Sequence, residues 1–476
     1  MPGSIRLCAA LAVATTLAAV GALAAEASAP RLTDWPEFGL NPQRTNATAE
    51  ATGISAANVS RLRARAVALP GTVDSSPIYL HGVEVAGATH DTIFVTTTYG
   101  ITLAIDASSG RVLWRFTPPG IARWRGSGQF TTASPVADPG RAFVYSASPN
   151  GEVHKLAVAT GREQAGWPVR ITTDPGHEKL TASLNVTGSL LLASTGGYFG
   201  DAPPYIGHVV AIDRSSGHIT AVFNSLCSNR RRIVAASTCR ASDSAILSRS
   251  GPVVEPGGVR VLISTGNGPY NGRTDFGDSV IELTLPDLAF RQAYTPVDQA
   301  KLNSGDMDLG SGSPAVLPGD LAWIAGKDSI QRLLNLAALD GGAPGTPPHT
   351  GNELQQLPTP GGQMVFTTPA VYGSLLFVAD GGGTAAYRVS GARLHPLWQN
   401  GTAGTSPIVA GGLLYVFNPG GSLVVYHPTS GRVVTTLNVG SGHWNSPIAV
   451  DGHLIVPTGN ANDHSTSGTL TIFSLS

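Results

Sequence analysis

Residues 104–114 read AIDASSGRVLW, two short apolar runs joined by a polar turn from Asp106 to Gly110. Apolar residues on both sides of a tight turn predict a β-hairpin. An aspartate side chain can bond its own turn backbone, and glycine tolerates a positive φ. A tryptophan at the end of the second strand covers apolar area against a neighbouring sheet. The stretch therefore predicts the outer half of a small β-sheet.

Weaker copies of this hairpin recur along the chain, which indicates a repeat protein. A second repeated signal is a small residue followed by proline, or a close variant, ahead of a β-rich run. We call these dipeptides openings. The eight openings are Ser76-Pro77, Ser134-Pro135, Ser183-Leu184, Gly251-Pro252, Ser313-Pro314, Thr368-Pro369, Ser406-Pro407 and Ser446-Pro447. Their spacing is about 40 residues near the C-terminus and rises to nearly 70 near the fourth and fifth, which fits four strands with inserted loops.

These repeats predict an all-β fold, an eight-bladed β-propeller of four-stranded antiparallel blades over residues 61–476. Residues 61–69, RLRARAVAL, alternate like an edge strand, and the eighth repeat ends after about three strands. We therefore expect this N-terminal strand to join the last blade and close the ring. Residues 30–60 would form an arm over the ring. Residues 331–339 are interpreted as a third strand, with a helical turn as the alternative.

The first 29 residues are typical of a secretory signal peptide, because Arg6 precedes an apolar run and Ala27 offers a cleavage site. No later window is apolar enough to predict a transmembrane segment. The sequence thus predicts a periplasmic or secreted protein. Cleavage would leave Cys227 and Cys239, and a disulfide between them would contribute about 3 kcal/mol. Two reduced, buried thiols are the alternative.

Charge narrows the choice of partner. The chain has a net charge of -1, and 13% of its residues are charged. Such a chain has no strong positive electrostatic potential to attract a polyanion, so the sequence argues against nucleic acid as a partner. We expect a small-molecule ligand, or an extracytoplasmic protein or glycan.

The hairpin at 104–114, the segment WPEFGLNP at 35–42 and the count of eight together resemble the PQQ-dependent alcohol dehydrogenases and their non-catalytic relatives. The resemblance extends from about Trp35 to the C-terminus. It implies the propeller fold, and in the catalytic members it implies PQQ and Ca²⁺ at the mouth of the central channel.

Three segments resemble parts of the family's active site: LISTGNGPYN at 262–271, NSGDMDLG at 303–310 and WIAGKD at 323–328. The resemblance implies Asn267 as a calcium ligand, Asp308 as the catalytic base next to the cation, and Lys327 against the quinone oxygens. Asp308 and Asp306 are further candidate metal ligands.

Each assignment has a structural alternative. Asn267 could belong to a Gly-Asn-Gly turn without a ligand. Asp306 and Asp308 could form a structural cation loop or be solvated turn residues, and Lys327 could be a lysine at the rim paired with an aspartate. Trp444, next to the last opening, could stack on a planar cofactor or pack between blades.

The sequence also departs from the catalytic members. It has no pair of adjacent cysteines, which those enzymes stack on PQQ. Their glutamate ligand is missing from the corresponding run TGGYFGD at 195–201, where Asp201 is the one nearby substitute. The sequence therefore favours a binding or scaffold module over a catalyst. The alternative is a periplasmic PQQ- and Ca²⁺-dependent dehydrogenase that oxidises an alcohol or sugar.

Overall fold

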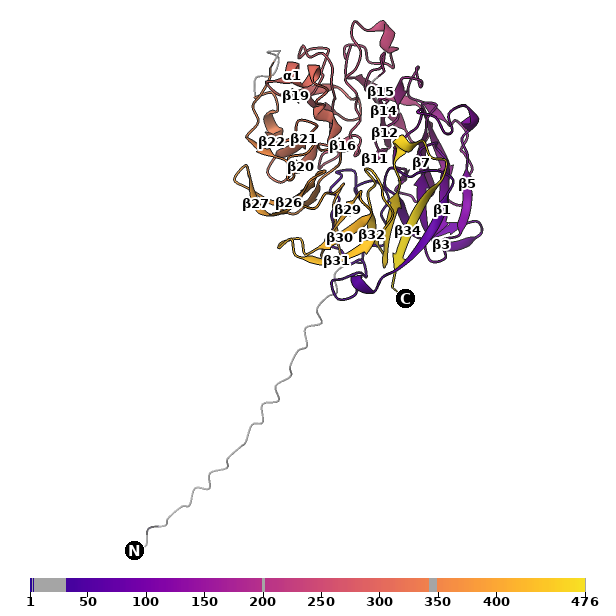
Figure 1. Cartoon of the computed structure of the whole chain (residues 1–476), viewed down its shortest axis with the longest axis vertical. Coiled ribbons are helices and arrows are strands. Elements are labelled where there is room, and N and C mark those ends of the chain that lie inside the picture. Colours follow the sequence, from indigo (N-terminus) through magenta and orange to yellow (C-terminus); the bar gives the residue numbers. More distant parts are fainter. Residues whose placement is uncertain (2, 4–30, 199–201, 342–348, 476) are drawn as a thin grey trace.

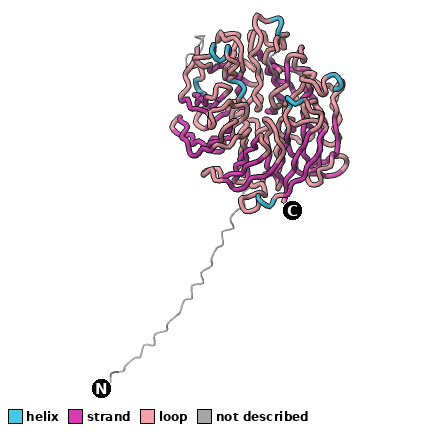
Figure 2. The backbone as a smooth tube through the Cα atoms, in the orientation of Figure 1, coloured by secondary structure: helices cyan, strands magenta, loops and turns pink. Residues whose placement is uncertain are grey.

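The computed structural model describes residues 1, 3, 31–198, 202–341 and 349–475. Within them, the chain forms eight four-stranded antiparallel sheets arranged around an axis, as predicted. Figure 2 shows that strands dominate and that helical segments are short. The predicted signal peptide lies outside the described residues apart from Met1 and Gly3, so it stays a prediction.

Each blade runs from an innermost strand to an outer strand. The first four blades comprise β2 Ile78–Val85, β3 Ala88–Thr96, β4 Thr102–Asp106 and β5 Val112–Phe116; β6 Val136–Ala137, β7 Phe143–Ser148, β8 Glu152–Ala157 and β9 Val169–Arg170; β11 Asn185–Thr187, β12 Leu190–Ser194, β14 His208–Asp213 and β15 Ile219–Asn224; β16 Val253–Val254, β17 Arg260–Ser264, β18 Val280–Thr284 and β19 Phe290–Tyr294.

The last four blades comprise β20 Ala315–Leu317, β21 Leu321–Ala325, β22 Ile330–Asn335 and β23 Gln355–Pro358; β24 Ala370–Tyr372, β25 Leu375–Ala379, β26 Thr384–Ser390 and β27 Arg393–Asn400; β28 Ile408–Ala410, β29 Leu413–Asn418, β30 Ser422–Tyr426 and β31 Val433–Asn438; β32 Ile448–Val450, β33 His453–Thr458, β34 Gly468–Ser474 and β1 Arg63–Leu69. A two-stranded ladder joins β10 Glu178–Lys179 to β13 Gly196–Gly197. The residues interpreted as a third strand in the fifth blade form β22 and then a 3₁₀ turn, Leu336–Ala338.

The remaining short helices lie in connections. In the described residues they are α1 Gln299–Ser304 and the 3₁₀ turns Val59–Arg61, Ile121–Arg123, Ala236–Thr238, Leu309–Ser311 and Ala461–Asp463.

The two ends of the chain share the eighth blade, which closes the ring. Strand β1 pairs with β34 from Arg63 opposite Ser474 to Leu69 opposite Gly468. Figure 1 shows the two strands side by side, although they lie at opposite ends of the colour scale. The pairing gives the eighth blade its fourth strand from the other end of the chain.

All eight openings stand immediately before an innermost strand. Hydroxyl groups of some openings connect neighbouring blades: the Ser76 backbone N–H donates to Ser134 Oγ over 2.9 Å, and the Thr368 N–H donates to Ser406 Oγ over 3.1 Å. Buried backbone donors need partners. The serine or threonine of an opening thus supplies a hydrogen bond that a β-ladder does not.

The hairpin motif explains how blades pack laterally. Asp106 Oδ1 accepts a bond from the Ser109 N–H over 2.7 Å, which fixes the turn. Trp114 lies against the next blade, where its Nε1–H donates to the Val158 carbonyl over 2.7 Å. A Cβ at Gly161 would lie 2.6 Å from the Trp114 ring, so only glycine fits there. Trp398 repeats this contact with Pro428 and Gly431.

The N-terminal arm covers one end of the central channel. It bonds the innermost strands of blades 2, 4 and 6, since the N–H groups of Ala137, Val254 and Val371 donate to arm carbonyls. Arg44 is 1% exposed and donates to Glu37, to the Phe38 carbonyl and to the Leu184 carbonyl. The arm is therefore fixed to the ring around a buried ion pair.

Candidate functional site at the channel mouth

The opposite end of the channel is its mouth, where the residues that precede the innermost strands gather. The predicted residues Asn267, Asp308 and Lys327 meet there. Asn267 follows β17 and Lys327 follows β21, the second strands of two neighbouring blades. Asp308 precedes the 3₁₀ turn Leu309–Ser311, which leads to β20. The fold thus brings all three segments together.

Asp308 is buried, and both of its oxygens have partners. Oδ1 accepts the Asn267 backbone N–H over 2.7 Å, and Oδ2 lies 2.5 Å from Lys327 Nζ. A Cβ at residue 266 would lie 2.4 Å from Asp308 Oδ1, so Gly266 allows this close approach. The carboxylate is held in place by its neighbours.

Lys327 provides the positive charge of this cluster. Its ammonium also donates to Asp306 Oδ1 over 2.8 Å, and Asn267 Nδ2 donates to the same oxygen over 2.8 Å. Burial opposes a charge at Lys327, but Asp308 and Asp306 hold its pKa above the ordinary value. The lysine is therefore charged and lies between two carboxylates.

A further carboxyl group, Asp278, lies next to the cluster and was not predicted from the sequence. It is 0% exposed, and its Oδ1 accepts the Leu309 N–H over 3.1 Å. Burial and the nearby Asp308 carboxylate raise the pKa of Asp278 to about 8. Asp278 is thus protonated at neutral pH.

Trp444 lies in an aromatic stack at the other side of the mouth. Its ring centroid is 4.7 Å from that of Phe366 and 3.7 Å from that of His443. The guanidinium of Arg249 lies 4.6 Å from the same ring. Among the described residues, Trp444 therefore stacks on the side chains of Phe366, His443 and Arg249.

Behind this stack, Arg249 and Asp74 come from different blades and contact each other across the channel. Arg249 is 4% exposed and donates to the Asp74 carbonyl over 2.9 Å, while the two side chains approach to 3.6 Å. His443 Nδ1 lies 2.8 Å from Asp74 Oδ2. Burial acts in the opposite direction, but Arg249 and His443 hold the pKa of Asp74 well below its usual range. Sequence reasoning missed this group, although each member lies two or three residues before an opening.

A cavity of about 310 Å³ opens beside the aromatic stack. Residues from blades 5 to 8 line it, with Gln363, Phe366, Thr367, Thr405, His443 and Trp444 among them. Asp380 also borders the cavity, but its oxygens accept the N–H groups of Gly361 and Gly382 over 2.7 Å each. The side chains left for a ligand are therefore aromatic or uncharged polar groups and an imidazole.

The described residues do not provide a complete calcium site. Ca²⁺ takes six to eight oxygen ligands. Asn267 Oδ1 is buried and has no hydrogen-bond partner, so it is one available donor. Asp308 is already paired with Lys327, and Tyr198, in the run without the glutamate ligand, donates its hydroxyl to the Pro175 carbonyl over 3.1 Å. Asp201 lies outside the described residues.

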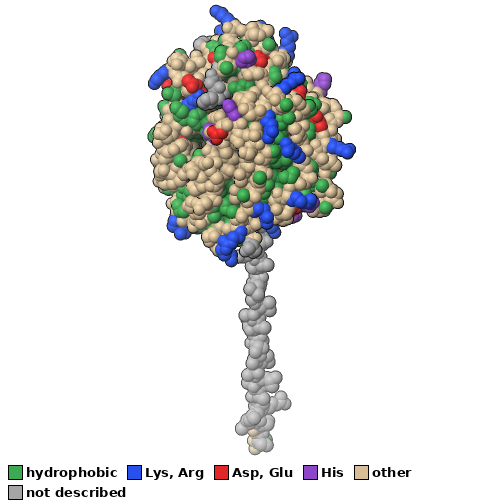
Figure 3. All heavy atoms as spheres, turned by 45° about the vertical axis from the view of Figure 1, so that its right-hand side comes forward, with side chains coloured by type: hydrophobic (Ala, Val, Ile, Leu, Met, Phe, Trp, Pro, Cys, Tyr) green, Lys and Arg blue, Asp and Glu red, His purple; other side chains and the backbone are tan. Residues whose placement is uncertain are grey.

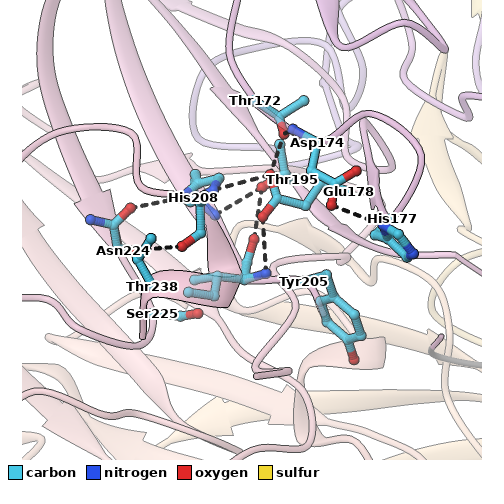
Figure 4. A network of polar contacts seen from close by, with 12 residues as sticks. Thr172, Asp174, His177, Glu178, Thr195, Tyr205, His208, Asn224, Ser225 and Thr238 are labelled. Atoms are coloured by element: carbon cyan, nitrogen blue, oxygen red, sulfur yellow. Dashed lines mark hydrogen bonds and ion pairs between the residues drawn. The ribbon is translucent and has the colours of Figure 1, made fainter. Parts of the chain in front are cut away.

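The third blade contains a buried polar network, shown in Figure 4. His208 is 0% exposed and lies between Glu178, 3.2 Å from its Nε2, and Asn224, 2.6 Å from its Nδ1. Asn224 Nδ2 donates to the carbonyls of Arg230 and Arg232. The network therefore fixes the loop that follows β15. Cys227 and Cys239 in this loop form a disulfide, which confirms the predicted bridge.

Comparison with known proteins agrees with this architecture. Solved structures of similar fold include quinohemoprotein alcohol dehydrogenase from Comamonas testosteroni, at 16% identity and a TM-score of 0.67 over 94% of this chain and 81% of that one. A europium-containing methanol dehydrogenase has 14% identity and a TM-score of 0.67 over 93% and 98% of the two chains. BamB from Moraxella catarrhalis has 12% identity and a TM-score of 0.51 over 86% and 98%. At these identities the likeness shows the fold alone.

The family itself is shown by sequence. Residues 50–275 and 350–474 match the family described as outer membrane protein assembly factor BamB, and the chain belongs to this family of PQQ-like propellers. No curated protein matches the sequence. Among the described residues, no helix is both long and apolar enough to cross a membrane.

Proposed function

We propose that this chain is an exported binding propeller that takes a neutral sugar unit of a glycan in the cavity at the channel mouth. The cavity is the observation that carries the proposal, because it combines an aromatic wall with uncharged polar side chains. Ligand sites in proteins commonly have this composition. Export rests on the signal peptide predicted for residues 1–29, with cleavage after Ala27.

The ligand chemistry follows from the lining. Phe366 and Trp444 offer apolar surface to a sugar ring, and Gln363 and Thr367 offer groups that bond hydroxyls. His443 lines the cavity with Nδ1 fixed by Asp74, which leaves Nε2 for a ligand. The carboxylate at this wall, Asp380, is occupied by backbone donors. An uncharged ring bearing hydroxyl groups therefore matches the cavity better than an anion.

Surface charge supports a neutral ligand. In the face shown in Figure 3, lysine and arginine side chains are scattered and do not merge into one basic area. The net charge of -1 agrees with that pattern. Neither feature favours a polyanion.

A quinoprotein dehydrogenase is the second candidate, favoured by the meeting of Asn267, Asp308 and Lys327. In that case Asn267 and Asp308 would hold the cation, and Lys327 would contact the quinone oxygens. The bound quinone would supply the hydride acceptor. Against this candidate, both oxygens of Asp308 already have partners, and the described oxygen donors are too few for Ca²⁺.

The test is titration calorimetry of the secreted protein with a set of neutral oligosaccharides. We expect Gln363→Ala and Phe366→Ala to weaken binding at least about tenfold, which is about 1.4 kcal/mol. Gln164→Ala, in the turn between β8 and β9, is the matched control and should bind normally. Absence of binding to any oligosaccharide would refute the proposal. Retention of added PQQ with Ca²⁺, together with dye-coupled alcohol oxidation that Asp308→Asn abolishes, would establish the second candidate instead.

A further inference from the structure

A second cluster of ligand-type side chains lies at the junction of the first and last blades, on the side covered by the arm. His81 lies in β2, Asp91 lies in the neighbouring β3, and Asp451 lies in the turn between β32 and β33. The three residues come from two blades that meet only because the ring closes. None of them belongs to the channel mouth.

The donor atoms of these residues converge. His81 Nδ1 lies 2.9 Å from Asp91 Oδ1 and 2.8 Å from Asp451 Oδ2, and the three ligand atoms lie within 4.8 Å of one another. A tetrahedral zinc ion with bonds of 2.0 to 2.2 Å separates its ligands by about 3.4 Å. Small rotations of the side chains would therefore make room for an ion.

The surrounding groups hold the carboxylates in position. The Tyr79 hydroxyl donates to Asp451 Oδ2 over 3.0 Å, and the Gly82 N–H donates to Asp91 Oδ1 over 2.8 Å. Such outer partners orient metal ligands in known sites.

The charge balance favours a cation. Arg31 lies 2.5 Å from Asp451 Oδ1, and Arg141 lies 3.1 Å from Asp34, whose Oδ1 accepts the His81 N–H. Three carboxylates, those of Asp34, Asp91 and Asp451, therefore face two guanidinium groups. His81 is half-exposed, its side chain being 50% accessible, so an ion can enter from solvent.

We propose that His81, Asp91 and Asp451 form a binding site for a divalent transition-metal ion of the zinc type, with water in the fourth position. One imidazole with two carboxylates suits such an ion better than Ca²⁺, which prefers oxygen ligands alone. The bound ion connects blade 1 to blade 8 beside the arm residues Arg31 and Asp34. It therefore stabilises the closed ring.

The experiment uses the full mature protein, dialysed against EDTA and then titrated with zinc chloride or cobalt chloride alone. We expect one equivalent to bind per chain, and cobalt to give the visible absorption of a four-coordinate site. Zinc at 100 times its Kd should raise Tm by about 3 °C, since the chain is large. His81→Ala and Asp91→Asn should each abolish the shift and the absorption.

His177→Ala is the matched control, because His177 pairs with Asp174 over 2.8 Å without a third ligand. It should bind the ion as the wild type does. The proposal is overturned when the wild type shows no shift in Tm, or when His81→Ala retains the shift and the stoichiometry. Asp91→Asn keeps the histidine, so a folding defect confined to the His81 variant would not hide the answer. None of these readouts depends on a ligand at the channel mouth.

Discussion

The two ends of the central channel each contain a buried arginine paired with a carboxylate, but their surroundings differ. At the arm end, Arg44 and Glu37 lie among backbone groups of the arm and of the third blade, the carbonyls of Phe38 and Leu184. At the mouth, Arg249 and Asp74 lie beneath His443 and Trp444, which border a cavity. A buried arginine–carboxylate pair therefore fixes the arm at one end of the channel and supports the cavity wall at the other.

The pKa values make the difference visible. Burial raises the pKa of Glu37 from 4.5 to about 7, and Arg44 only partly opposes this effect. Asp74 is equally buried, yet Arg249, His443 and the Ala461 N–H hold its pKa well below the usual range. The number of donors around a buried carboxylate thus decides which protonation state the fold prefers.

The largest effect is expected from Arg44→Ala. This change leaves Glu37 buried without a counter-charge and removes bonds to the carbonyls of Phe38 and Leu184. Breaking a buried pair from one side costs about 3–5 kcal/mol of unfolding free energy. Urea unfolding would measure it, with Arg61→Ala at an exposed position as the control. If Arg44→Ala and Arg61→Ala lose equally little unfolding free energy, the arm does not stabilise the ring through Arg44.

Arg249→Ala should cost less, about 2 kcal/mol, because hydrogen bonds to a charged group are worth about 1.5–3 kcal/mol and several remain. Asp74 keeps its contact with His443 and the N–H groups of Trp444 and Ala461. The same urea experiment compares the two arginines directly. A loss at Arg249 as large as that at Arg44 would mean that the remaining donors to Asp74 do not compensate for the lost arginine.

Local signals made the ring predictable. Each opening combines a small residue with proline or a close variant, and all eight precede an innermost strand; Ser134, for example, bonds the neighbouring blade. The hairpin at 104–114 was equally readable, because Asp106, Gly110 and Trp114 act within one turn or against the next blade. The closing strand followed from counting strands at the two ends.

The site was predictable only in part. Asn267, Asp308 and Lys327 were found through resemblance, and the structure shows that they meet. Their mutual pairing depends on distances that sequence spacing does not give. Arg249 and Asp74 are 175 positions apart and meet only across the assembled channel. Roles for these residues in a reaction stay predictions.

The pH dependence of stability should have opposite signs at the two ends. Glu37, with its raised pKa, contributes stability below pH 4.5 that is lost as the pH rises to about 7. Asp74, with its lowered pKa, contributes stability above pH 3.8 that is lost as the pH falls further. Each proton changes the slope by at most about 1.4 kcal/mol per pH unit.

Urea unfolding from pH 3 to pH 8 would check both signs. Glu37→Gln should remove the decline between pH 4.5 and 7, and Asp74→Asn should remove part of the decline below pH 4. The two variants serve as controls for each other, because each should leave the other's range unchanged. Identical profiles for both would show that the two ends do not differ in this way.

A last comparison, Asp278→Asn, separates burial from position along the channel. Asp278 lies at the mouth but has no arginine, and its pKa is raised to about 8 by burial and Asp308. Its contribution to stability is therefore present below pH 3.8 and is lost as the pH rises through 8, as at Glu37. The wild type should lose up to about 1.4 kcal/mol per pH unit between pH 4 and pH 8, and the asparagine variant, which never has to bury a charge, should not show this decline. A pH profile equal to that of the wild type would mean that Asp278 is solvated, and location would then explain the contrast between the ends better than the count of donors.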